Sequence, residues 1–210
     1  MFKKKKKRKT IILDFDGTIV DSLPLIFKIT NEVLKSYGDE ELPPSKIEKL
    51  KREGVKNALS ELNLSIFSFS FLILKIQFRL YNRVDEIELF TKMRDSVEKL
   101  SKNFQLGILT NNRKKIVNKF LLQNDFNDFN FVKSNFLLRK KSKKLKKINS
   151  GDVIAYVGDQ KTDMIAAKEV GIQAVGVSWG FDESSELKEG GADFVAEKPE
   201  ELISFFRRFE

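Results

Sequence analysis

The stretch Thr10–Thr18, with the sequence TIILDFDGT, decides the fold of this chain. It opens as a short apolar run of the kind found in buried strands, and it ends in two acids and a glycine. Asp14 and Asp16 stand two residues apart, and side chains at that spacing in a strand point to the same face. Gly17 lets the backbone turn sharply and approach a ligand closely. The stretch therefore predicts a buried strand running into a functional loop whose paired carboxylates could hold one metal ion, although a plain polar turn can also carry two acids.

The same pattern recurs along the chain. Short apolar runs with glycine or polar residues at their ends occupy 104–110, 152–157, 174–179 and 192–196. Helical patterns occupy 92–102, 114–123, 143–149, 162–170 and 199–208. Strands that alternate with helices form right-handed crossovers, which predicts an α/β fold with a Rossmann-like parallel sheet and helices on both faces. In such sheets the ligand binds at the carboxyl ends of the strands.

Residues 19–88 break this alternation. Apolar residues recur at helical spacing over 23–37, and the pattern stops at Gly38. A second helix is expected over 46–62, and 72–80 is expected to be helical because it lies between helical segments. The sequence thus predicts a small α-helical cap domain, 19–88, inserted after the first strand of a core formed by 1–18 and 89–210.

Charge and composition limit the function classes. The 210 residues include 39 Lys and Arg against 30 Asp and Glu, but seven bases lie in Lys3–Lys9 and seven in Arg139–Lys147. The body of the chain is acidic without these two runs, so nucleic acid is not the favoured partner. The sequence has no His and no Cys, which excludes disulfides, thiolate zinc sites and His-dependent triads. Oxygen ligands remain, and they favour a hard cation such as Mg²⁺.

The most apolar stretch, Leu64–Leu74, is about half the length that crosses a bilayer, and we expect it to be buried in the protein. The basic run at the N-terminus is followed by only three apolar residues before Asp14, so it does not resemble a secretory signal. We therefore expect no membrane partner and a cytoplasmic location.

Two other strand ends carry polar side chains. Asp159 and Asp163 follow the run at 152–157, and together with the first acid pair they could converge on one cation. Asp159 alone could equally be the N-cap of the next helix. Thr110 and Asn111 could offer a hydroxyl and amides to a phosphate, or could form an ordinary turn. One base from Arg139–Lys147 would complete a site for a phosphoryl group.

Four motifs in order resemble those of the haloacid-dehalogenase-like hydrolase superfamily. They are DFDGT at 14–18, LTNN at 109–112, a lysine in KKSKKL at 140–145, and VGDQKTD at 157–163. The resemblance covers nearly the whole chain. DSLP at 21–24 resembles the phosphoglycolate-phosphatase-like branch, in which a helical cap follows the first motif directly.

The resemblance implies a catalytic role for both acids of the first motif. Asp14 would be the nucleophile that forms an aspartyl-phosphate, and Asp16 would protonate the leaving oxygen and then activate water. Asp16 also favours phosphoryl transfer over dehalogenation, because dehalogenation needs no leaving-group acid. By the same similarity Mg²⁺ would be held by Asp14, Asp159 and the backbone carbonyl of Asp16, with Asp163 in or next to the shell.

The remaining implied roles concern the phosphoryl group. Thr110 and Lys141 would act on it directly, and Gly17 and Asn111 would contribute to its binding site. The third motif lacks its usual prolines, so Lys140 stays an alternative to Lys141. The leading hypothesis is a Mg²⁺-dependent phosphatase for a small phosphorylated metabolite, either phosphoglycolate-like or a sugar phosphate. A phosphomutase, or a non-catalytic polyanion-binding protein, remains the alternative, and the sequence does not indicate an oligomeric state.

Overall fold

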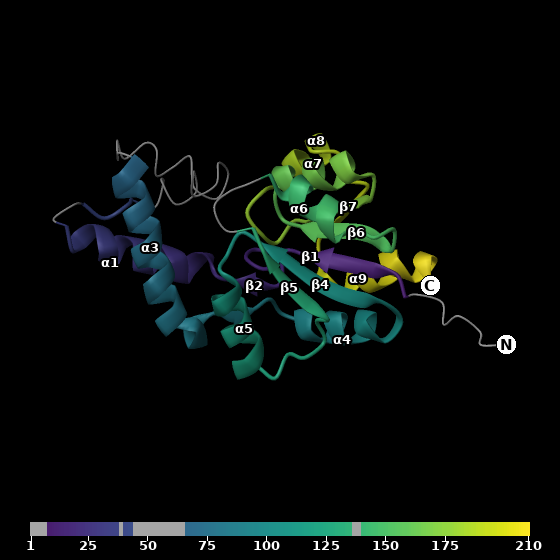
Figure 1. Ribbon diagram of the computed structural model, residues 1–210, viewed down its shortest axis with the longest axis horizontal. Helices are drawn as coiled ribbons and strands as arrows, with labels where there is room; N and C mark the ends of the chain where they lie inside the picture. Colours follow the sequence, from purple (N-terminus) through teal and green to yellow (C-terminus); the bar gives the residue numbers. More distant parts are fainter. Residues whose placement is uncertain (1–7, 38–39, 44–65, 136–139) are drawn as a thin grey trace.

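The computed structural model describes residues 8–37, 40–43, 66–135 and 140–210. Its main feature is a six-stranded parallel sheet in the order β5-β4-β1-β6-β7-β8 (Figure 1). The strands are β1 (Thr10–Leu13), β4 (Gln105–Thr110), β5 (Phe131–Ser134), β6 (Val153–Gly158), β7 (Gln173–Val177) and β8 (Phe194–Ala196). The predicted α/β fold with a parallel sheet is confirmed. Because β1 lies between β4 and β6, the polar residues that follow these three strands meet at one edge of the sheet.

Helices cover both faces of the sheet, as Figure 1 shows. One face is covered by α4 (Met93–Asn103), α5 (Lys114–Gln123) and α9 (Pro199–Phe206), and the other by α6 (Lys141–Ile148), α7 (Lys161–Val170) and α8 (Ser184–Glu189). Each face has its own hydrophobic cluster, to which Phe120 on α5 and Met164 on α7 belong respectively. The strands of such a sheet are buried on both sides, which explains their nearly continuous apolar runs.

Two helices of the insertion stand beside the sheet. They are α1 (Leu23–Lys35) and α3 (Ile66–Asn82), which pack against each other. At their base β2 (Val20–Asp21) pairs antiparallel with β3 (Glu88–Leu89), so the chain leaves and re-enters the core through one small ribbon. The helical prediction for 72–80 is confirmed. The helix predicted over 46–62 lies outside the described residues, and the division into domains stays a prediction.

The structure differs from the sequence-based expectations in several elements. Strand β5, the ribbon of β2 and β3, and helix α8 were not predicted, because each has only two to six residues and a weak periodicity. The expectation that Leu64–Leu74 is buried can be compared with the described side chains of 71–74 alone, and it is wrong for part of them: Leu72 is buried, whereas Phe71 is 54% exposed and Leu74 45% exposed. A helix that packs through one face leaves the residues of its other face in solvent. In the described part of the chain no helix is long and apolar enough to cross a membrane.

The packing of α5 on the first motif generates a stability prediction. Phe120 contacts Phe15, the residue between the two acids, edge to face with ring centroids 5.3 Å apart, and both rings are fully buried. Phe120→Ala should lower the free energy of unfolding by about 3–5 kcal/mol through lost burial and a cavity. Leu122→Ala, on the same helix but 76% exposed, should change it by about 0.5 kcal/mol or less. Urea unfolding monitored by circular dichroism measures both, and equal effects would contradict this packing.

Candidate active site

Asp14 follows β1 directly and is held at the centre of the sheet edge. Its amide donates to the carbonyl of Val157 at 2.8 Å, and its Oδ1 accepts a hydrogen bond from the amide of Phe15 at 2.7 Å. The residue is only 6% exposed. The other carboxylate oxygen, Oδ2, forms an ion pair with the Nζ of Lys141. Oδ1 is thus used to orient the Asp14 side chain, and Oδ2 faces the ammonium group of Lys141.

Lys141 is the first residue of α6, and its side chain reaches into the acid cluster. Besides Asp14, its Nζ contacts Oδ1 of Asp163 at 2.6 Å. Burial by itself lowers the pKa of this ammonium group, but Asp14 and Asp163 raise it well above the usual value, so Lys141 stays charged. Lys140, the alternative from the sequence, is exposed, as is Lys143. In this basic run the side chain of Lys141 is therefore buried, whereas those of Lys140 and Lys143 lie in solvent.

Asp159 and Asp163 are fully buried near the end of β6. Asp159 accepts hydrogen bonds from the Thr18 hydroxyl at 2.9 Å and from the amide of Phe181 at 3.0 Å. It is not the N-cap of α7, because Gln160 takes that position. Burial, reinforced by the neighbouring carboxylates, raises the pKa of Asp159 well above its usual value. Burial also raises the pKa of Asp163 to about 6, although Lys141 acts in the opposite direction.

Asp14, Asp159 and Asp163 form a group that could hold a metal ion. Each offers one carboxylate oxygen, and these oxygens lie within 4.8 Å of one another. Three buried carboxylates so close together repel, and a divalent cation would relieve that repulsion better than Lys141 alone. An all-oxygen donor set suits a hard cation such as Mg²⁺. The predicted acids therefore come together in a geometry that fits the predicted ion.

Asp16 is not part of this group, and its carboxylate is hydrogen-bonded to neutral side chains. Its Oδ1 accepts a hydrogen bond from the hydroxyl of Ser22 at 2.7 Å, and the Asn112 side-chain amide donates to Oδ2 at 3.1 Å. Burial raises the pKa of Asp16 to about 6, with Asp14 adding to the rise and the hydrogen bond from Ser22 opposing it. A carboxyl group with such a pKa can both give and take a proton near neutral pH.

Thr110 and Asn111, the two residues predicted at the end of β4, are placed differently. Thr110 is buried, and its hydroxyl lies 3.5 Å from Oδ2 of Asp16 and accepts the Asn112 amide at 2.9 Å. Asn111 is exposed, and its side-chain oxygen accepts a hydrogen bond from Asn135. The asparagine side chain that reaches Asp16 is therefore Asn112, which sequence reasoning missed. Its position inside the LTNN motif was the available signal.

Two glycines make room for Asp159. Gly17 has φ +74°, and a Cβ at this position would overlap Oδ2 of Asp159 and come within 2.5 Å of the Phe181 ring. A Cβ on Gly180 would overlap the Asp159 side chain and the carbonyl of Gly17. The close approach predicted for Gly17 is thus to a buried carboxylate, which the absence of a side chain allows.

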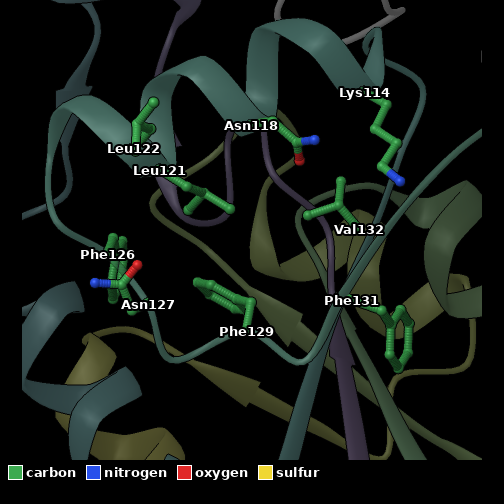
Figure 2. Close-up of a pocket in the computed structure, with 9 residues that line it drawn as sticks. All are labelled: Lys114, Asn118, Leu121, Leu122, Phe126, Asn127, Phe129, Phe131 and Val132. Atoms are coloured by element: carbon green, nitrogen blue, oxygen red, sulfur yellow. The ribbon is translucent and has the colours of Figure 1, made fainter.

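A groove between α5 and β5 lies apart from these residues (Figure 2). It has a volume of about 340 Å³ and is mainly apolar. Its lining residues are Lys114, Asn118, Leu121, Leu122, Phe126, Asn127, Phe129, Phe131 and Val132. None of the acids or the lysine described above lines it, so we assign the chemistry to the acid cluster and not to this groove.

The chain is similar to known proteins along nearly its whole length. Residues 11–177 match the family model of haloacid dehalogenase-like hydrolases. The chain is 28% identical to the phosphoglycolate phosphatase of Synechococcus elongatus over 93% of its own length and 95% of the relative, and 24% identical to that of Aquifex aeolicus over the same shares. A predicted phosphatase from Clostridium acetobutylicum has a similar fold, with a TM-score of 0.83, 19% identity and coverage of 96% of this chain and 99% of that one.

The space around Asp159 generates a prediction with a matched control. Gly17→Ala should lower the free energy of unfolding by about 1–2 kcal/mol through its positive φ and by about 1–3 kcal/mol more through the clash with Asp159. Gly151 has φ +90°, and a Cβ at this position would meet no atom within 4 Å, so Gly151→Ala should show only the backbone effect. Chemical denaturation of the two variants separates the two effects. Equal losses would mean that Asp159 does not occupy the described position.

Proposed function

The chain belongs to the haloacid dehalogenase-like hydrolase family, and we propose that it is a Mg²⁺-dependent phosphatase for a small phosphomonoester. The substrate class we propose is a phosphoglycolate-like compound or a sugar phosphate. The names of the curated relatives, phosphoglycolate phosphatases that align over nearly their whole length, support the first of these.

The observation that carries the proposal is the ion pair of Lys141 with both Asp14 and Asp163 inside a buried acid cluster. A lysine held against a carboxylate in this way keeps a cation beside the atom that would attack phosphorus. Lys141 has three N–H donors and pairs with two carboxylates, so its ammonium group could also donate to a phosphoryl oxygen. This arrangement supports phosphoryl transfer more than simple metal storage, which needs no internal cation.

In the proposed first step, Asp14 attacks the phosphorus of the substrate, and the bond from phosphorus to the leaving oxygen breaks. Asp16 gives its proton to that oxygen, so the alcohol leaves neutral and Asp14 carries the phosphoryl group. In the second step Asp16 accepts a proton from water, and the water oxygen attacks phosphorus. Inorganic phosphate leaves and the Asp14 carboxylate is restored. Covalent catalysis of this kind divides one difficult displacement into two easier ones.

The other residues of the site bind and orient. Mg²⁺, when held by Asp14, Asp159 and the Asp16 carbonyl with Asp163 next to it, would neutralise charge on the phosphoryl oxygens. Lys141 and the Thr110 hydroxyl would bind those oxygens. Ser22 and Asn112 would hold the Asp16 carboxyl group toward the leaving oxygen, as their hydrogen bonds to it suggest. Gly17 and the backbone of Asn111 would make further contacts to the phosphoryl group.

We also propose that 19–88 forms a helical cap domain on a core of 1–18 and 89–210. The antiparallel pair of β2 and β3 at the two ends of the insertion supports this division. Substrate specificity would then depend on side chains of the insertion, much of which lies outside the described residues. A cytoplasmic location stays a prediction.

A phosphate-release screen tests the proposed activity. Over a panel of phosphomonoesters, the protein should release inorganic phosphate with Mg²⁺ and stop when EDTA removes it. Asp14→Asn should abolish release, because an amide cannot attack phosphorus. Asp21→Asn, a matched change at an exposed acid seven residues along the chain, should leave turnover within about threefold of wild type. Turnover by Asp14→Asn at the wild-type rate, or full activity after thorough chelation, would refute the proposal.

Adjacent lysines give a second test. Lys141→Ala should lower kcat/KM by about 10²–10³-fold, the scale of losing one preorganised charge donor. Lys140→Ala removes the same side chain at an exposed position and should have little effect. Steady-state kinetics on the two variants decides between them. An equal loss in both, or a larger loss in Lys140→Ala, would remove Lys141 from its proposed role.

A further inference from the structure

Tyr156 is the largest fully buried side chain of the described residues, and it lies directly beside the candidate site. It belongs to β6, three residues before Asp159, and pairs in the sheet with Ile12 of β1. A tyrosine in an apolar cluster is costly unless its hydroxyl is hydrogen-bonded, whereas leucine or phenylalanine would fill the same space without that demand. The buried hydroxyl of Tyr156 therefore requires a hydrogen-bond partner.

The hydroxyl of Tyr156 donates to the carbonyl of Leu109 at 3.0 Å. Leu109 lies on β4, next to Thr110, and β4 and β6 flank β1 on opposite sides. The side chain of Tyr156 thus reaches across β1, the strand that leads to Asp14, and links β6 to β4. This hydrogen bond fixes where the ring lies.

The ring in turn contacts the buried lysine. The Nζ of Lys141 lies 5.6 Å from the centroid of the Tyr156 ring, within the range at which an ammonium group is attracted to an aromatic ring. Besides this ring contact, Lys141 pairs with Asp14 and Asp163 and interacts electrostatically with the Tyr156 hydroxyl. A lysine has a long flexible side chain, and a fixed ring on one side limits where its ammonium group can go.

We propose that Tyr156 is a positioning residue: its ring, anchored by the hydroxyl on the Leu109 carbonyl, holds the Lys141 ammonium group between Asp14 and Asp163. This inference rests on the proposed function for its kinetic consequence, but not for the placement of Lys141. The alternative is that Tyr156 only fills the core. If Tyr156 positions Lys141, replacing Tyr156 should affect activity through Lys141. If Tyr156 only fills the core, the effect should not depend on Lys141.

A double-mutant cycle tests the kinetic consequence. Tyr156→Leu removes ring and hydroxyl and should lower kcat/KM by about tenfold in the wild-type background, but by no more than about twofold in Lys141→Ala. Tyr156→Phe keeps the ring and should recover part of the loss. Val153→Ala, on the same strand and in the same apolar cluster, controls for lost packing and should not lower kcat/KM. Equal losses in both lysine backgrounds, or the same loss in Val153→Ala, would overturn the proposal.

Amine acylation followed by mass spectrometry tests the placement without any turnover. Labelling of Lys141 relative to exposed Lys143 on the same helix should be slow in wild type, faster in Tyr156→Leu and unchanged in Val153→Ala. Unchanged labelling of Lys141 in Tyr156→Leu and Tyr156→Phe would contradict the inference even in an active enzyme. Absence of phosphate release from every substrate would instead refute the proposed function, while the labelling result would still decide the role of Tyr156.

Discussion

The constraint on which this structure depends is the burial of three carboxylates at one end of a parallel sheet, with one lysine among them. Asp14, Asp159 and Asp163 are buried close together, and their mutual repulsion has to be relieved either by a compensating cation or by protonation. Lys141 supplies one positive charge, and the donor geometry suits a second, divalent one. The first turn of α6 places Lys141 among the acids, and the glycines around Asp159 leave room for its buried carboxylate.

The second acid of the first motif lies in a different environment from the first. Asp14 faces the ammonium group of Lys141, whereas Asp16 faces a hydroxyl and an amide and has a pKa raised to about 6 by burial. Two carboxyl groups in different environments can take different chemical roles. Ser22, which holds Asp16, is the residue just before the first inserted helix, so the position of the acid is linked to the base of the insertion.

Much of this could be predicted from the sequence because the signal is local. The apolar runs of β1, β4 and β6 indicated the sheet, and the acids after β1 and β6 indicated the convergence of Asp14, Asp159 and Asp163. The sequence favoured Lys141 but left Lys140 as an alternative, because neighbouring residues at the start of a helix face different ways and only the packing of α6 decides which one is buried. Asn112 was missed for a similar reason, since only the turn after β4 determines which asparagine faces Asp16. Short elements such as β5 carry too little periodicity to be recognised.

The most direct test of the central claim, that Asp14 attacks phosphorus, is chemical trapping of the intermediate. Borohydride reduces an acyl phosphate but not a free carboxylate, so it should convert Asp14 to homoserine during turnover. Tandem mass spectrometry locates the change. The account predicts that Asp14 is converted to homoserine only when Mg²⁺ and a phosphomonoester substrate of the protein are both present. It predicts no conversion of Asp16. Turnover with no conversion at Asp14, or with conversion at another carboxylate, would contradict it.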